Sequence, residues 1–105
     1  MSRVIDNVEA FRAERAWGAL DLAEIGGASV ALHWTDQPYR WHRNQGAEVF
    51  VVLAGEVDMH TRRDGRETVV RLRPTDIYVA EEGDAHKAVP IGEARVLVIE
   101  QQGSP

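Results

Sequence analysis

The sequence predicts an all-β protein that folds as a sandwich or a small barrel. After the first 28 residues, short apolar stretches alternate with turn-forming residues, a pattern typical of these two architectures. Several of the stretches are apolar on both faces, which requires that both faces be covered. The chain has 105 residues, a length that fits one domain, so we expect residues 1–105 to form a single domain.

One short helix is expected near the N-terminus, in the segment DNVEAFRAERAW at residues 6–17. Asp6 can cap its first turn, and Glu9 follows three residues later, as a capping box requires. Val8 and Phe11 would then share one face of the helix.

The remaining elements are expected to be strands. Residues 29–34 alternate between apolar and other side chains, which indicates a strand. Residues 56–72 form a predicted hairpin, because the Asp64-Gly65 pair suits a two-residue turn with positive φ. Gly55 is expected to end the strand before it. Three further strands are predicted at residues 48–55, 76–80 and 94–100.

Composition excludes several classes of function. The chain has no cysteine, so disulfides, thiolate metal sites and cysteine nucleophiles are excluded. The formal net charge of −5 argues against nucleic acid and anionic membranes as partners. No apolar run approaches the length of a membrane span, and the first residues lack the apolar core of a signal peptide. We therefore expect a cytoplasmic protein.

Polar side chains stand at positions that should face the interior of the predicted sheet. His42 and Asn44 are two residues apart, so they point the same way along an extended chain. Glu48 shares its face with Phe50 and Val52. A carboxylate on an apolar face is costly unless it is paired or bound to a cation. The pattern therefore indicates a cation site or a buried ion pair.

The spacing around these residues resembles the first motif of the cupin superfamily, which runs G-x5-H-x-H-x3 or 4-E-x6-G. This chain has His42-Arg43-Asn44, three residues, Glu48, six residues and Gly55. Asn44 stands where the motif has its second histidine. The resemblance is to small single-domain cupins of the mannose-6-phosphate-isomerase-like kind.

A second stretch resembles the other cupin motif, G-x5-P-x-G-x2-H. The spacing is kept from Thr75 through Glu81 and Gly83 to His86, with Thr75 in place of the first glycine and Glu81 in place of the proline. The resemblance covers nearly the whole chain. It implies an all-β jelly-roll barrel, the double-stranded β-helix of cupins, with the short N-terminal helix added to it.

The resemblance further implies a metal site in the barrel. His42, Glu48 and His86 would be its ligands, a set of two histidines and one carboxylate that suits Fe(II) and also Mn, Ni or Zn. Asn44 would add a weak neutral oxygen ligand or a hydrogen bond to bound water. The alternative is a decayed site, in which hydrogen bonds alone satisfy these residues.

Other aromatic and imidazole side chains are assigned from the strand patterns. Trp41, Phe50 and Tyr78 can line a pocket for a small-molecule substrate. His33 and His60 lie opposite the apolar faces of their predicted strands. We therefore expect both to face solvent or a neighbouring sheet rather than to bind metal.

Two classes of function remain open. The first is a metal-dependent enzyme that acts on a small molecule as an oxygenase, isomerase or lyase. The sequence shows no separate general base of the Ser-His-Asp or paired-carboxylate type, so catalysis would depend on the metal. The second is a non-catalytic module that binds or senses a small ligand, with or without metal.

A homodimer is also expected. Residues 48–55 and 94–100 are apolar on both faces, and one short helix cannot cover the outer face of so small a barrel. The family resemblance favours dimers as well.

Overall fold

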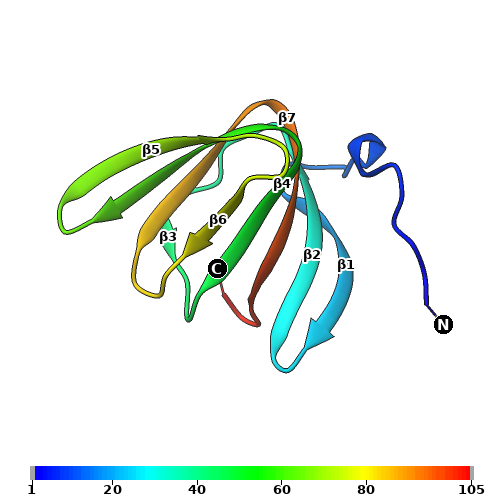
Figure 1. The fold of residues 1–105 in the computed structure, drawn as a ribbon, viewed down its shortest axis with the longest axis horizontal. Coiled ribbons are helices and arrows are strands. Elements are labelled where there is room, and N and C mark those ends of the chain that lie inside the picture. Colours follow the sequence, from blue (N-terminus) through cyan, green and yellow to red (C-terminus); the bar gives the residue numbers. More distant parts are fainter. Residues whose placement is uncertain (1, 105) are drawn as a thin grey trace.

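The computed structural model describes residues 2–104 as one strongly curved antiparallel sheet (Figure 1). Its strands, in chain order, are β1 (Gly18–Ile25), β2 (Ala28–Thr35), β3 (His42–Arg43), β4 (Glu48–Arg63), β5 (Arg66–Leu72), β6 (Ile77–Ala80) and β7 (Ala85–Gln101). They are ordered β1-β2-β7-β4-β5, while β3 pairs with β7 and β6 pairs with β4. The all-β prediction is confirmed, although the pairings follow an open path that ends at β1 and β5 rather than a closed ring.

Two long strands, β4 and β7, build both halves of the molecule. The first part of β4 pairs with β6 and its last part with β5, while β7 pairs first with β3 and then with β2. Both strands bend sharply, as Figure 1 shows at the top of the view. The two halves of the sheet therefore face each other across a shared interior.

The prediction that a strand ends at Gly55 is wrong, because β4 continues through it to Arg63. The pairing of β4 with β7 is irregular on both sides of Ala54, and Gly55 has a φ of 78°. A Cβ on Gly55 would run into the backbone carbonyl of Glu93. Gly55 therefore permits a bulge and a bend where a strand end was expected.

The core lies between the two halves of the sheet. Cross-strand neighbours point to the same face of a sheet. Val98 pairs with Ala31 on β2 and with Phe50 on β4, so all three side chains point into the interior. The buried hydrophobic cluster consists of Phe50, Val52, Val57, Met59, Leu72, Ala88, Ala94, Val96 and Val98.

The predicted N-terminal helix does not form. The segment contains one 3-10 turn, η1 (Val8–Ala10), and Asn7 before it adopts a left-handed conformation without a side-chain cap. The chain is held instead by the sheet, since Arg95 donates a 2.9 Å hydrogen bond from Nε to the carbonyl of Phe11. Arg12 also lies 5.2 Å above the ring of Trp34. A short helix is marginal in water, so these contacts decide the conformation.

The other strand predictions are confirmed. Besides the two-residue β3, one full strand was not predicted. Asp64 and Gly65 have φ values of 53° and 76°, and they join β4 to β5 as a two-residue turn. The unpredicted strand is β1, an edge strand whose side chains are largely exposed. Within residues 2–104 the structure contains no helix that is long and apolar enough to cross a membrane.

Candidate metal centre

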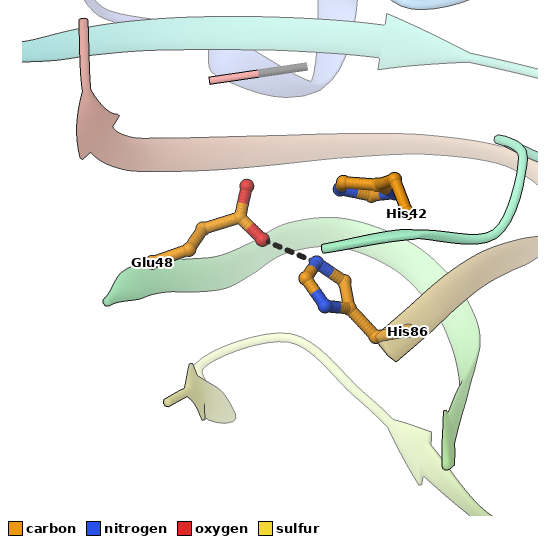
Figure 2. Close-up of side chains that lie close together, drawn as sticks. All are labelled: His42, Glu48 and His86. Atoms are coloured by element: carbon orange, nitrogen blue, oxygen red, sulfur yellow. Dashed lines mark hydrogen bonds and ion pairs between the residues drawn. The ribbon is translucent and has the colours of Figure 1, made fainter. Parts of the chain in front are cut away.

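Three strands bring His42, Glu48 and His86 together (Figure 2). His42 lies on β3 and is the cross-strand partner of His86 at the start of β7. Glu48 is the first residue of β4. Each residue offers a ligand atom that lies within 4.8 Å of the other two. The set predicted from motif spacing is therefore a spatial cluster.

His86 is the most deeply buried member of the cluster. Its side chain is 2% exposed, and its Nε2 donates a 2.8 Å hydrogen bond to Oε1 of Glu48. Its Nδ1 lies 3.4 Å from the carbonyl oxygen of Asp84. The backbone carbonyl thus fixes one ring nitrogen, and the other points to the carboxylate.

His42 is held in a similar way. Its Nδ1 donates a 3.0 Å hydrogen bond to the carbonyl oxygen of Arg40, and its ring centre lies 4.2 Å from that of His86. Burial is the main reason why the pKa of His42 is lowered, and the nearby His86 contributes in the same direction. The neutral ring therefore keeps a free lone pair on Nε2 at neutral pH.

Glu48 is buried, yet it remains ionised. Burial raises the pKa of its carboxyl, but the hydrogen bonds with His86 and Glu100 and the charge of His86 together lower the pKa below its ordinary value. The cluster therefore places a negative charge beside two imidazoles.

Asn44 is buried beside this carboxylate without a hydrogen-bond partner. Its residue is 6% exposed, and neither its Oδ1 nor its Nδ2 bonds any group in residues 2–104. A buried amide that stays unpaired costs about 1–3 kcal/mol. A bound cation or a water on that cation would remove this cost.

These features fit a divalent transition metal. Histidines that bind metal commonly donate their other ring N–H to a backbone carbonyl, as His42 does here. Nδ1 of His86 also faces a backbone carbonyl oxygen, at 3.4 Å. Glu48 adds the carboxylate of a two-histidine, one-carboxylate set. The amide of Asn44, near Glu48 and unpaired among residues 2–104, is one more buried polar group that a cation or its water could satisfy.

The cluster forms part of the wall of a half-open cavity of about 180 Å³. The apolar and aromatic lining consists of Trp17, Tyr39, Phe50, Met59, Ala88 and Val98. The polar lining consists of His33, His42, Glu48, His86, Glu100 and Ser104. A small molecule in this cavity would therefore touch both an apolar wall and the candidate ligands.

The three residues expected to line a substrate pocket are placed differently from one another. Phe50 lines the cavity. Tyr78 packs against the core beside it, 6.1 Å from the ring of His86, and its hydroxyl bonds Thr61 at 2.5 Å. Trp41 does not line the cavity, and its ring instead lies 4.0 Å below the guanidinium of Arg62. Of the three residues, Phe50 alone is among those that line this cavity.

The two other histidines also differ in position. His60 lies away from the cavity and bonds Glu67 at 3.1 Å, in line with its predicted outward position. His33 was expected to face solvent or a neighbouring sheet, but its ring lines the cavity. His33 pairs across the sheet with Val96, a core residue, so both side chains point inward.

Glu100 is a second residue of the cavity that the sequence analysis did not single out. It is the cross-strand partner of Glu48, so the two carboxyl groups face the same side of the sheet. Burial, followed by the hydrogen bond and the charge of Glu48, raises the pKa of Glu100 to about 8. At neutral pH the pair of carboxyl groups therefore holds one proton. The signal for it was the period-two series Val96, Val98 and Glu100.

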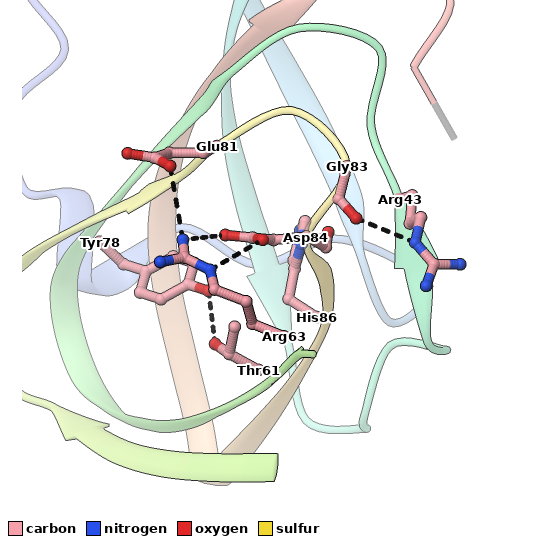
Figure 3. A network of polar contacts seen from close by, with 8 residues as sticks. All are labelled: Arg43, Thr61, Arg63, Tyr78, Glu81, Gly83, Asp84 and His86. Atoms are coloured by element: carbon pink, nitrogen blue, oxygen red, sulfur yellow. Dashed lines mark hydrogen bonds and ion pairs between the residues drawn. The ribbon is translucent and has the colours of Figure 1, made fainter. Parts of the chain in front are cut away.

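A network of polar contacts holds the loop before His86 (Figure 3). Arg63 donates to the side chain of Asp84, at 3.1 Å from Nε, and to Glu81 at 3.4 Å. Arg43 donates a 2.9 Å hydrogen bond to the carbonyl oxygen of Gly83. Two arginines from β3 and β4 thus fix the turn whose last carbonyl contacts His86.

Comparison with solved structures shows the cupin fold. A cupin-2 domain containing protein from Shewanella frigidimarina is 23% identical, with a TM-score of 0.77, and the match covers 92% of this chain and 90% of the other. A cupin superfamily protein from Desulfitobacterium hafniense is 15% identical, with a TM-score of 0.79 and coverage of 96% and 92%. No protein-family model and no curated protein matches the sequence.

The fold also occurs in a metal-containing enzyme. A hydroquinone 1,2-dioxygenase solved with Fe3+ is 15% identical, with a TM-score of 0.76, and the match covers 87% of this chain but 29% of that one. At these identities the likeness establishes the fold, and the chemistry must be argued from the residues of this chain.

Proposed function

We propose that this chain binds a divalent transition metal through His42, Glu48 and His86 and acts as an enzyme on a small molecule. The observation that carries the proposal is the arrangement of two imidazoles, each with Nδ1 next to a backbone carbonyl, around one buried carboxylate. The cavity beside them has room for a ligand. The metal would be Fe, Mn, Ni or Zn.

The reaction classes that fit are those of an oxygenase, an isomerase or a lyase. When bound, a metal with this ligand set supplies Lewis-acid or oxygen-activating chemistry. The dioxygenase neighbour with Fe3+ supports this proposal by its fold. The mannose-6-phosphate-isomerase-like subtype and a cytoplasmic location remain predictions from the sequence.

The side chains around the cluster prepare it for a cation. The carbonyl of Arg40 orients His42 so that Nε2 is free. The hydrogen on Nε2 of His86 lies between His86 and Glu48, so binding of a metal there would release a proton. Glu100 holds a proton next to Glu48 and limits the negative charge of the cavity.

One observation favours the second candidate, a non-catalytic module that binds a small ligand. Glu48 and His86 satisfy each other through their 2.8 Å hydrogen bond, so the cavity can keep its shape without a cation. The test is to measure the affinity of the metal-free protein for a small molecule before and after metal is added. An affinity that does not change would support this candidate over the enzyme.

The proposal is tested by elemental analysis of protein purified without an affinity tag. We expect bound transition metal in the parent protein and its loss in His86→Ala, because that change removes a buried ligand. His60→Ala is the control, since His60 bonds Glu67 away from the cavity. Equal metal content in the two variants would show that the ligands are assigned wrongly.

A further inference from the structure

We propose that the cavity takes a small uncharged ring compound with a hydroxyl group that donates a hydrogen bond to Nε2 of His33. This inference rests on the proposed function and names the substrate class for the same site. It depends on four features of the cavity: the state of His33, the aromatic wall, the volume and the absence of cationic side chains from the lining.

His33 provides a hydrogen-bond acceptor. Its Nδ1 lies 3.0 Å from the carbonyl oxygen of Trp17. A carbonyl only accepts, so Nδ1 carries a hydrogen, and Nε2 is the ring nitrogen that can accept one from a ligand. Within residues 2–104 no group bonds this Nε2, although the ring lines the cavity. A ligand with a hydroxyl group could donate a hydrogen bond to this Nε2.

Nε2 of His33 and the candidate metal ligand Glu48 lie opposite different positions along β7. Along β7, Glu100 pairs with Glu48 and Val96 pairs with His33. The two positions are four residues apart, which corresponds to about 13 Å of extended strand. The acceptor on His33 is therefore separated along the strand from the candidate metal ligand Glu48.

The aromatic part of the lining suits a flat apolar body. The ring of Trp17 lies 5.4 Å from that of Tyr39 and 6.5 Å from that of Phe50, and both rings are tilted relative to it. Aromatic side chains in such arrangements present faces and edges to a further ring. Val98 and Ala88 add aliphatic surface.

The volume sets the size of the ligand. The cavity measures about 180 Å³, and an apolar protein cavity of about 150 Å³ is known to hold benzene. One ring with one or two small substituents therefore fills the space, whereas a nucleotide or a disaccharide exceeds it.

The charges of the lining exclude anions. None of the described residues that line the cavity is an arginine or a lysine. Glu48 places a negative charge inside it. In the metal-free protein a phosphate ester or a carboxylate would be buried without a cationic side chain there, which is unfavourable. An uncharged hydroxyl group meets no such penalty.

The test measures binding of phenol, toluene and benzoate by NMR titration in the presence of a chelator. Working without metal separates this inference from the proposed function, which elemental analysis tests independently. We expect phenol to bind about three- to tenfold more tightly than toluene, because it adds one neutral hydrogen bond. Benzoate should bind more weakly than either.

Three variants assign the effect. His33→Phe should remove the preference for phenol over toluene, while His33→Gln should keep it, because an amide can both donate to Trp17 and accept from the ligand. His60→Phe is the matched control on the outer face and should change neither affinity. Phenol binding that persists in a parent protein without metal would support the inference even if the metal assignment failed.

Results with the parent protein alone can overturn the inference. It fails if phenol does not bind at millimolar concentration, if toluene binds as tightly as phenol, or if benzoate binds as tightly as phenol. It also fails if a folded His33→Phe variant keeps the full preference for phenol.

Discussion

Asn44 is buried at the position where the resembling motif has its second histidine, and both polar atoms of its amide lack a partner among residues 2–104. A neutral amide oxygen is a weak ligand for a transition metal, whereas imidazole suits Fe, Ni and Zn. The residue therefore limits the affinity of the candidate site, while its burial next to Glu48 places it where a ligand would act.

Asn44→His is expected to tighten binding of Ni or Zn by about tenfold or more, because the new imidazole joins ligands that are already in place. Metal titration of both proteins in one buffer measures the effect. Gln45→His is the control, since Gln45 is exposed. If neither parent nor Asn44→His binds metal, the site has decayed; equal affinities would mean that Asn44 does not point at the metal.

The raised pKa of Glu100 predicts that the stability of the metal-free protein depends on pH. Its pKa of about 8 in the folded state lies above the ordinary value of 4.5, so the folded protein holds a proton that the unfolded chain releases. The contribution of Glu100 to stability is therefore full below about pH 4.5 and falls as the pH rises to about 8. Glu100→Gln, which cannot ionise, should lose less stability over this range.

Thermal unfolding of both proteins between pH 5 and pH 8, with chelator present, measures that difference. Glu24→Gln replaces an exposed glutamate on β1 and should follow the parent curve. Parallel curves for the parent and Glu100→Gln would contradict a raised pKa at this position.

At the residue scale, motif spacing predicted the cluster but did not identify all of its surroundings. His42, Glu48 and His86 were found because their spacing matches a known pattern. His33 was misplaced because the alternation in residues 29–34 favours Val30, Leu32 and Trp34 as the inward face of β2. The inward orientation of His33 follows from its pairing with the core residue Val96. The two residues are 63 positions apart in the sequence, so no local pattern reveals this pairing.

At the element scale, the loop before His86 depends on side chains from other strands. Arg63 reaches Asp84 and Glu81 from the end of β4, and it lies far from the core on an exposed hairpin. Removal of the Arg63 side chain is therefore expected to change the position of His86 more than the stability of the fold.

Arg63→Ala is expected to lower metal affinity about tenfold, as loss of a group that supports a ligand commonly does. Arg71→Ala is the matched control, because Arg71 makes a comparable pair with Asp58, with contacts of 2.8 and 3.0 Å, away from the cavity. Metal titration and thermal unfolding of both variants provide the comparison. Equal losses of affinity would show that the loop does not need Arg63.

Secondary-structure elements were predicted correctly where neighbouring residues in the sequence determine the conformation. Asp64-Gly65 specifies its turn through positive φ, and the hairpin formed as expected. The helix at residues 6–17 was wrong because the sheet competes for that segment through Arg95 and Trp34. Gly55 reads as a strand end in the sequence, yet the close approach of Glu93 makes it a bulge inside a longer strand.

At the scale of the whole molecule, the outer face of the sheet is more apolar than a single chain can cover. Val49 pairs with Val79 and Val51 pairs with Ile77 on that face. Ile77 is 62% exposed and Val79 is 57% exposed. The N-terminal segment contacts Trp34 and Arg95, and it forms no helix that would extend this cover.

We therefore predict a homodimer that buries this outer face. An obligate interface typically covers about 2,000 Å² or more and is apolar, which agrees with continuous rows of valine, leucine and isoleucine over β2, β7, β4 and β6. Light scattering at micromolar concentration should give twice the mass of the chain, and Ile77→Asp should yield monomers. Val69→Asp, on an equally exposed position of β5, should leave the dimer intact. A monomeric parent protein, or dissociation by Val69→Asp alone, would mean that the apolar face on β6 has another role.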